Sequence, residues 1–296
     1  WLKEGEQMRV EDLIKAVCVV SGNDAAVALG EHLAGSEEAF VARMNERAKE
    51  LGMNDTHFVN CTGLPADGHV TSAYDIALMS RELIWRHPDI RRFTTIWMDS
   101  LRDGASMLVN TNKLVRFYPG ATGLKTGSTD SAKYCISATA EKDGMELIAV
   151  ILGGSTSDKR FSDAKALLNY GFAAYSLVTV TPESPLPAVP VTLGTQKTVQ
   201  SVLTSESALL LEKSRANGLT QAVSLPGGRA ARHARYFRRK RHTGRIASAA
   251  RGRKHTAPHV ERAFLPPAQA RVLRCISSLR FSQKSFAFFV IRRSSA

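Results

Sequence analysis

Residues 122–154 read TGLKTGSTDSAKYCISATAEKDGMELIAVILGG, and this stretch decides the fold class. Two runs within it, 134–140 and 147–152, are rich in the β-branched and apolar residues that favour strands. Asp143-Gly144 between the runs is typical of a tight hairpin turn. The sequence therefore predicts successive antiparallel strands here, with Lys125-Thr126-Gly127 opening one of them.

Helical patterns lie on both sides of these predicted strands. Apolar residues recur at helical spacing across residues 13–33, with a break at Ser21-Gly22-Asn23. Ser72, followed by Asp75, has the spacing of a capping box at the start of a further helix. Residues 158–171 return to helical spacing, and the glycine at their end favours a helix stop. Helices, then strands, then a closing helix predict an α+β domain with helices packed on an antiparallel sheet.

Positive charge is concentrated in the last quarter of the 296 residues. Residues 1–226 hold 22 Lys and Arg against 26 Asp and Glu, whereas residues 227–296 hold 18 against 1. The net charges are −4 and +17, which together give the +13 of the whole chain. We expect three parts: a domain over 1–175, a small β-rich domain over 176–226 with strands broken by prolines, and a disordered basic tail over 227–296.

Several classes of protein are excluded by composition. The 44% apolar and 23% charged residues are normal for globular domains, which excludes a wholly disordered or fibrous chain. The four cysteines form no C-x-x-C pair and no cluster with histidine at metal-ligand spacing, so we expect no metal site. No apolar run approaches the roughly 18 residues that span a bilayer. The chain starts without Met and without a leader, and we expect it to be a processed product or a fragment.

Two tripeptides carry the chemistry, Ser21-Gly22-Asn23 and Lys125-Thr126-Gly127. At average residue usage an S-x-N triplet arises by chance about once per chain of this size, and K-T-G in about one chain in ten. Their order, with a hairpin directly after K-T-G, resembles the penicillin-recognising serine acyl-transferases, whose signature is S-x-x-K, S-x-N and K-T-G. The surrounding residues, including His57-Phe58-Val59-Asn60 and Tyr118-Pro119-Gly120, are similar to the D-alanyl-D-alanine carboxypeptidases among the low-molecular-weight penicillin-binding proteins. This resemblance is close over residues 1–175, looser over 177–225 and absent in the tail.

The resemblance implies a fold and an activity. The fold is a β-lactamase/transpeptidase-like domain followed by a small β-rich domain. The activity is a serine-type hydrolase that removes the terminal D-Ala from peptidoglycan pentapeptides through an acyl-enzyme, without a cofactor. β-Lactam antibiotics are the second implied class of ligand, and an extracytoplasmic location follows from the resemblance alone.

Three residues would act on the reacting bond, according to the resemblance. Ser21 would relay a proton to the leaving nitrogen, and Asn23 would orient the lysine partner of the nucleophile and the substrate amide. Lys125 would supply positive potential and hold the Ser21 hydroxyl. The competing interpretations are a plain inter-helix turn at Ser21-Gly22-Asn23 and a solvated strand-end charge at Lys125.

Four more residues would bind the substrate. Thr126 would bond its terminal carboxylate, and Gly127 would let an extended peptide lie against the strand edge. The backbone N–H of Ser128 would form half of the oxyanion hole. Arg160 would be a second carboxylate ligand, since a planar guanidinium suits bidentate binding, or else a surface ion pair. We expect His57 and His69 to be structural or solvent-facing.

The nucleophile motif S-x-x-K does not precede Ser21. Its one match in the chain runs from Ser162 to Lys165, inside the predicted closing helix and after K-T-G, so we interpret it as a chance match. We expect that an N-terminal segment carrying the nucleophile was lost. The polypeptide as written should then be inactive, because removing the nucleophile abolishes nearly all triad-type catalysis.

Two alternatives remain open. A class A β-lactamase would need an E-x-x-x-N loop, whose literal match between the two motifs is Glu50 to Asn54; we interpret this match as coincidental. Alternatively, the chain is non-catalytic and its Arg-rich tail binds nucleic acid or an anionic membrane. Peripheral membrane contact fits the amphipathic C-terminal anchor of the resembled family, and we expect no nucleic-acid partner. An out-of-frame translation after Pro226 would also explain the tail.

Overall fold

The structure is a computed structural model that describes residues 2–180, 185–190, 198–200, 202–203, 207–214, 220–224, 234–239, 249–251 and 285–292. The chain divides into two compact units. The first unit holds residues 1–172 with 273–296, and the second holds residues 173–272.

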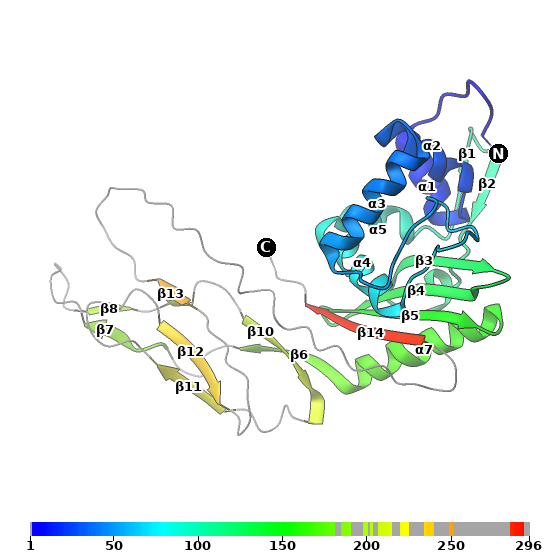
Figure 1. The fold of residues 1–296 in the computed structure, drawn as a ribbon. Helices are drawn as coiled ribbons and strands as arrows, with labels where there is room; N and C mark the ends of the chain where they lie inside the picture. The colour runs from blue at the N-terminus through cyan, green and yellow to red at the C-terminus, as the bar shows by residue number, and fades with distance from the viewer. Residues whose placement is uncertain are drawn as a thin grey trace, which may run out of the picture. The chain divides into compact units, whose positions relative to one another are not determined.

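The first unit combines helices with an antiparallel sheet, in agreement with the predicted α+β class (Figure 1). Its elements before the sheet are α1 (Val10–Val20), α2 (Asn23–Ala34), α3 (Glu37–Leu51), α4 (Ala73–Arg86), η1 (Pro88–Ile90), α5 (Arg91–Thr94), β1 (Met98–Leu101), β2 (Ser106–Val109) and α6 (Leu114–Phe117). The sheet and its closing helix consist of β3 (Ala121–Thr129), β4 (Lys133–Lys142), β5 (Met145–Gly154), α7 (Ser157–Ala174) and β14 (Ser285–Arg292).

The sheet has the strand order β14-β5-β4-β3, and all its neighbours are antiparallel. Asp143 and Gly144 join β4 to β5 with φ of 52° and 71°, the left-handed values that a two-residue hairpin turn needs. The predicted hairpin is therefore confirmed. K-T-G, however, lies within β3 rather than at its start, because β3 already begins at Ala121.

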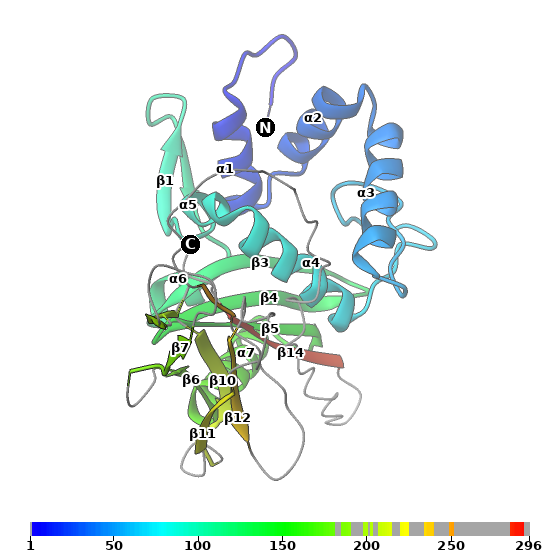
Figure 2. The ribbon, with the colours of Figure 1, turned by 90° about the vertical axis from the view of Figure 1, so that its left-hand side faces the viewer.

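Helices cover both faces of this sheet (Figure 2). On one face, Ala77 and Ile84 of α4 pack against Ile148 and Val150 of β5. The alternate residues of β4 and β5 are equally buried, and α7 lies on that opposite face (Figure 2). Burial on both faces explains why β4 and β5 read as continuous apolar runs instead of alternating ones.

The break between α1 and α2 falls where the sequence predicted it. Ser21 follows α1 with φ of 63°, in the left-handed region that ends helices, and α2 begins at Asn23. Val19, fully buried at the end of α1, packs against Leu101 and Leu108 of the β1–β2 hairpin. This packing fixes the end of the helix that carries Ser21.

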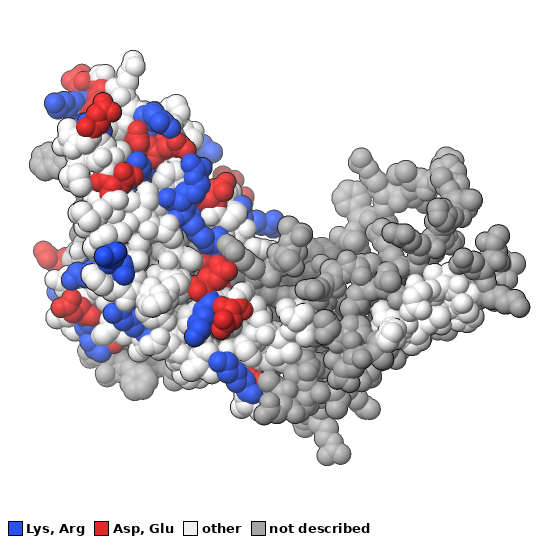
Figure 3. Space-filling view, turned by 180° about the vertical axis from the view of Figure 1, so that it is seen from behind, with Lys and Arg blue, Asp and Glu red and all other residues white. Residues whose placement is uncertain are grey.

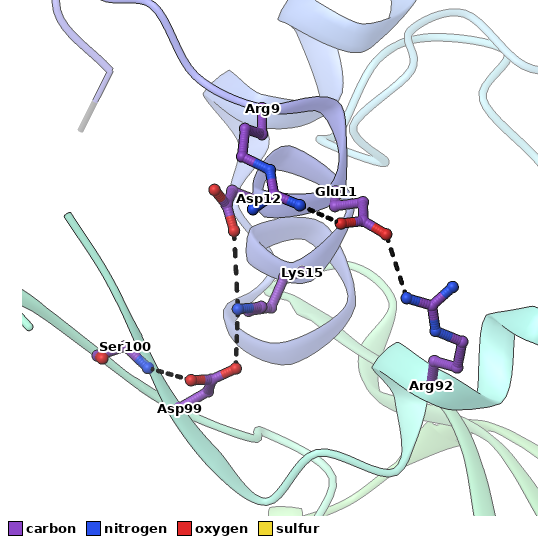
Figure 4. A network of polar contacts seen from close by, with 7 residues as sticks. All are labelled: Arg9, Glu11, Asp12, Lys15, Arg92, Asp99 and Ser100. Carbon is purple, nitrogen blue, oxygen red and sulfur yellow. Dashed lines mark hydrogen bonds and ion pairs between the residues drawn. The ribbon is translucent and has the colours of Figure 1, made fainter. Parts of the chain in front are cut away.

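Charged side chains fix the outer face of α1 (Figure 4). Lys15 lies 2.8 Å from Asp99 of β1 and 3.6 Å from Asp12. The hydrogen bond from Lys15 lowers the pKa of Asp99, and the same bond raises the pKa of Lys15. Arg92 of α5 contacts Glu11 at 3.1 Å on the neighbouring side of the helix. The network joins α1 to both the hairpin and α5.

Two local predictions differ from the structure in detail. Ser72 does cap α4 by accepting a hydrogen bond from the Asp75 N–H, but the Asp75 carboxylate accepts from the Asp55 N–H and the Thr56 hydroxyl instead of closing a capping box. The closing helix α7 also runs past Gly171 to Ala174, because Gly171 is buried inside the helix. In both cases a tertiary contact overrides the local signal.

The second unit contains short strands in its described residues. β6 (Tyr175–Val180) pairs with β10 (Ser207–Glu212), and β7 (Ala188–Pro190) pairs with β8 (Thr198–Gln200). A further sheet has the order β11-β12-β13-β9 and consists of β9 (Val202–Leu203), β11 (Thr220–Ser224), β12 (Ala234–Arg239) and β13 (Ala249–Arg251). The unit is β-rich in its described residues, and two of its strands follow Pro226, where the sequence predicts the β-rich domain to end.

The structure thus describes three strands, β12, β13 and β14, within the range where the sequence predicts a low-order tail. The Phe-Val-Ile composition of residues 285–292 favours a strand. The rest of residues 227–296 lies outside the described residues, and so do most of the arginines on which the binding-tail and out-of-frame hypotheses depend.

On the face opposite that of Figure 1, Lys and Arg side chains of the described residues are interspersed with Asp and Glu (Figure 3). This mixture agrees with the net charge of −4 over residues 1–226. Among the described residues, no helix combines the length and apolar character that crossing a membrane requires.

Candidate active site

The two motifs meet in space, although 104 residues separate Ser21 from Lys125. The Lys125 ammonium donates a hydrogen bond to the Ser21 hydroxyl, and a second one, of 2.7 Å, to the Thr126 carbonyl. Ser21 is exposed and Lys125 is half-buried, so their contact lies at the surface of the unit. The structure therefore brings the helical S-x-N motif and the K-T-G strand into one site.

Burial lowers the pKa of Lys125 to about 8. The Cys18 thiol opposes this shift, and the positive charge of Arg160 adds to it. Burial in turn raises the pKa of Cys18 to about 11, which makes that thiol a poor nucleophile at neutral pH. The lowered pKa brings the titration of Lys125 close to neutral pH, so this group can both attract an anion and exchange a proton.

Thr126 is buried, and its hydroxyl lies 2.6 Å from the hydroxyl of Thr111. Thr111 is exposed, and its backbone N–H donates to the Val19 carbonyl at 3.0 Å. Val19 lies two residues before Ser21, so Thr111 contacts both halves of the site. Sequence reasoning missed Thr111, because its part depends on contacts between residues distant along the chain.

Gly127 and Ser128 are exposed and pair with Cys135 and Tyr134 of β4. A side-chain carbon added at Gly127 would have no heavy atom within 4 Å. This end of β3 therefore has room for an extended ligand that lies along the strand.

Arg160 of α7 is buried, with 7% of its surface exposed, so the alternative of a surface ion pair is wrong. Its guanidinium donates to the Gly127 carbonyl at 3.1 Å and to the Cys135 carbonyl at 3.3 Å, and burial lowers its pKa. Within the described residues its Nε is buried without a hydrogen-bond partner. The guanidinium supports the open end of β3 and places a positive charge under it.

Asn23, the remaining predicted catalytic residue, is the exposed first residue of α2. Within the described residues its amide makes no hydrogen bond to Ser21 or Lys125.

Of the two histidines expected to be structural or solvent-facing, His57 is exposed and the side chain of His69 makes structural contacts. His69 accepts a 3.3 Å hydrogen bond from the Val59 N–H and packs edge-on against Phe58, and burial lowers its pKa. His57 forms a β-bridge with Val70.

The two chance motif matches also have ordinary surroundings. Glu50, from the E-x-x-x-N match, lies exposed on α3 and pairs with Arg47 at 2.6 Å. Ser162, from the S-x-x-K match, donates to the Lys159 carbonyl within α7. Neither residue belongs to the site formed by the two motifs.

A groove of about 470 Å³ lies elsewhere in the first unit, against α3 and α4. Phe40, Met44, Phe58 and Met79 are among its lining residues, and it includes none of the predicted site residues. Across the described part of the chain, no three His, Cys, Asp or Glu side chains gather as metal ligands would.

Comparison with known proteins gives the family of this chain. The family model described as D-alanyl-D-alanine carboxypeptidase matches residues 1–156. The chain belongs to the D-alanyl-D-alanine carboxypeptidase family. Both motifs, Ser21-Gly22-Asn23 and Lys125-Thr126-Gly127, lie inside the matched range.

Individual members of the family are similar over different lengths. D-alanyl-D-alanine carboxypeptidase DacF of Bacillus subtilis is 43% identical over 217 residues, which are 72% of this chain and 55% of DacF. Penicillin-Binding Protein D2 of Listeria monocytogenes, in its cefotaxime-bound form, is 40% identical with a TM-score of 0.52, over 56% of this chain and 67% of that one. Penicillin binding protein 5 of Haemophilus influenzae is 26% identical with a TM-score of 0.67, over 85% and 76%.

These likenesses confirm the predicted family and the α+β fold. The chain spans about half the length of the curated relatives that it matches.

Proposed function

We propose that this chain carries the proton-relay and carboxylate-binding part of a serine D-Ala-D-Ala carboxypeptidase. The observation that carries the proposal is the hydrogen bond between Lys125 and Ser21, which joins the two family motifs in one site. The substrate is a peptidoglycan stem peptide that ends in D-Ala-D-Ala. Its cleavage adds water across the last amide bond and releases D-alanine.

In the proposed reaction, the serine of an S-x-x-K segment gives its hydroxyl proton to the lysine of that motif and attacks the carbonyl carbon of the penultimate D-Ala. As the C–N bond breaks, that proton passes through Ser21 to the leaving nitrogen, and the lysine is neutral again. Water then hydrolyses the ester: one of its protons returns to the serine oxygen, and its hydroxyl stays on the carbonyl carbon. Lys125, half-buried with its pKa near 8, holds the Ser21 hydroxyl in place for this relay. Asn23 orients the substrate amide beside them.

The carboxylate of the leaving D-Ala binds at the other end of the site. The Thr126 hydroxyl bonds it directly, and the buried positive charge of Arg160 attracts it from beneath β3. The peptide lies along the open edge at Gly127, with the Ser128 N–H directed at the developing oxyanion. A β-lactam would bind the same groups, in line with the cefotaxime-bound form of the Listeria relative.

The proposed substrate also suggests a location. Peptidoglycan lies outside the cytoplasm, so we propose an extracytoplasmic protein. The basic residues 227–296 would favour peripheral contact with an anionic membrane surface.

D-Alanine release tests the proposal directly. The protein is expressed twice, once as the 296 residues and once together with the coding sequence that precedes Trp1 in its gene, and each form is given a D-Ala-D-Ala pentapeptide and a fluorescent penicillin. We expect no product and no labelled band from the 296 residues. We expect both from an extended protein that contains S-x-x-K, and their loss in its Lys125→Ala variant. A folded extended protein with S-x-x-K but without activity would contradict the proposal.

A further inference from the structure

Five residues of the site form a closed ring of contacts. Lys125 bonds Ser21, and Thr126 follows Lys125 in β3. The Thr126 hydroxyl contacts the Thr111 hydroxyl at 2.6 Å, and the Thr111 N–H reaches the Val19 carbonyl at 3.0 Å. Val19 then leads through α1 back to Ser21. Val19 and Thr111 belong to neither family motif, and Thr111 is the one of the two whose side chain contacts a motif residue.

The loop that carries Thr111 is held in place by its neighbours on both sides. The Asn110 amide donates to the Ile96 carbonyl at 2.7 Å, and its oxygen accepts from the Asn112 N–H at 2.8 Å. The Asn112 side chain then accepts from the Leu114 N–H at 3.1 Å. Asn110 and Asn112 are both buried, whereas Thr111 between them is exposed. The two asparagines fix the backbone and leave the threonine side chain free to serve the site.

Two hydroxyls at 2.6 Å share one hydrogen, so one donates and the other accepts. A buried hydroxyl that donates its proton to an anion still has lone pairs on its oxygen. These lone pairs are satisfied when the oxygen accepts a hydrogen bond from another group. Thr126 is the buried partner, and Thr111 is the exposed one that can itself accept from water. The favoured direction therefore runs from Thr111 to Thr126 and onward to a carboxylate, and each bond polarises the next.

We propose that Thr111 is a positioning residue of the carboxypeptidase site. Its hydroxyl donates to Thr126 and directs the Thr126 proton at the terminal carboxylate of the peptide. Its backbone N–H holds the end of α1, and with it Ser21, at a fixed distance from β3. The inference rests on the proposed function, because the carboxylate is the group that Thr126 is directed at.

The hydroxyl of Thr111 can be removed without changing the backbone contact of this residue. Thr111→Val keeps the β-branched shape and the N–H to Val19 but removes the hydroxyl. Thr111→Ser keeps the hydroxyl and is the matched control. Thermal unfolding of both variants checks that the fold is intact.

The first measurement needs no ligand. Three-bond NMR couplings from the backbone nitrogen and carbonyl of Thr126 to its γ-methyl report whether that side chain occupies one rotamer. We expect one rotamer in the wild-type chain and in Thr111→Ser, and averaged couplings in Thr111→Val.

The second measurement compares two acetylated tripeptides ending in D-Ala-D-Ala, one with a free carboxylate and one with a C-terminal amide. We expect Thr111→Val to bind the free acid about tenfold more weakly, the size of one hydrogen bond to a charged group, and the amide with less than a twofold change. Thr111→Ser should stay within twofold of the wild type for both peptides.

The outcomes separate this inference from the proposed function. Unchanged couplings together with unchanged affinities in Thr111→Val would overturn the positioning role. An equal loss for acid and amide would also overturn it, because a general structural defect does not discriminate between them. If the wild-type chain binds neither peptide, the proposed function fails, and the Thr126 couplings still decide whether Thr111 orders that side chain.

Discussion

The Lys125 ammonium donates a hydrogen bond to the Ser21 hydroxyl, which joins a strand of the sheet to the end of a helix 104 residues earlier. The bond holds a hydroxyl against a half-buried amine whose pKa is lowered by burial. A serine beside such an amine can pass a proton on and recover it, which neither group would do alone in water at neutral pH.

Lys125 should titrate near pH 8 in the folded chain. Its 13Cε signal, assigned with a Lys125→Arg variant, follows the titration, and a urea-unfolded sample supplies the ordinary value near 10.5. Because the folded pKa is the lower one, the stability linked to this group is fully present above about 10.5 and is lost as the pH falls through about 8. A midpoint at 10 or above would contradict the burial of this amine.

Arg160 should contribute to the low pKa of Lys125 through its positive charge. Arg160→Met removes that charge, so the Lys125 midpoint should rise, whereas Arg160→Lys should leave it near 8. Both variants lose guanidinium bonds to the Gly127 and Cys135 carbonyls, and each should unfold about 1 to 3 kcal/mol more easily. Equal midpoints in the two variants would show that the Arg160 charge does not act on Lys125.

Alanine at Gly127 and alanine at Gly120 should affect different properties, peptide binding in the first case and stability in the second. Gly127→Ala should leave the free energy of unfolding within about 0.5 kcal/mol, because a Cβ there meets nothing, but it should weaken peptide binding along the strand edge. Gly120→Ala, the matched control, should destabilise the fold by about 1 to 3 kcal/mol. Its φ of 82° is left-handed and its Cβ would collide with the Glu141 carbonyl. Urea denaturation measures both, and normal peptide affinity in Gly127→Ala would argue against strand-edge binding.

A buried ion pair lies beneath the start of β3. Glu146, 1% exposed, contacts Arg91 and accepts a 3.0 Å hydrogen bond from the Thr122 hydroxyl. Glu146→Gln should cost about 3 to 5 kcal/mol of unfolding free energy, because the Arg91 charge loses its partner. Removing both charges in Glu146→Gln with Arg91→Gln should cost less than the sum of the two single changes. Strict additivity in denaturant unfolding would show that the pair is not coupled.

Local signals were enough to predict much of the fold. The helix break at Ser21-Gly22-Asn23, the Ser72 cap and the Asp143-Gly144 turn each depend on a few neighbouring residues, and all three were predicted. The same local reasoning fails at Gly171, where packing lets α7 continue to Ala174.

The candidate site was predicted from its two motifs. Their meeting at Ser21 and Lys125 is a contact between distant parts of the chain, which the sequence can only suggest. Thr111 and Glu146 had no local signal. Thr111 acts through contacts with Val19 and Thr126, and Glu146 is an acid inside an apolar strand whose partner Arg91 lies 55 residues away. Sequence periodicity does not encode such pairs.

Peptide binding by the 296 residues tests whether Ser21 and the K-T-G strand form one site for the terminal carboxylate, because binding needs no nucleophile. An NMR titration follows the backbone amides of Ser21, Gly127 and Ser128 as an acetylated tripeptide ending in D-Ala-D-Ala is added. We expect these three signals to move together with one dissociation constant, and we expect the amide-capped peptide to move them only with a clearly weaker dissociation constant. Signals that move without Ser21, or that respond equally to the amide-capped peptide, would contradict a shared site for the terminal carboxylate.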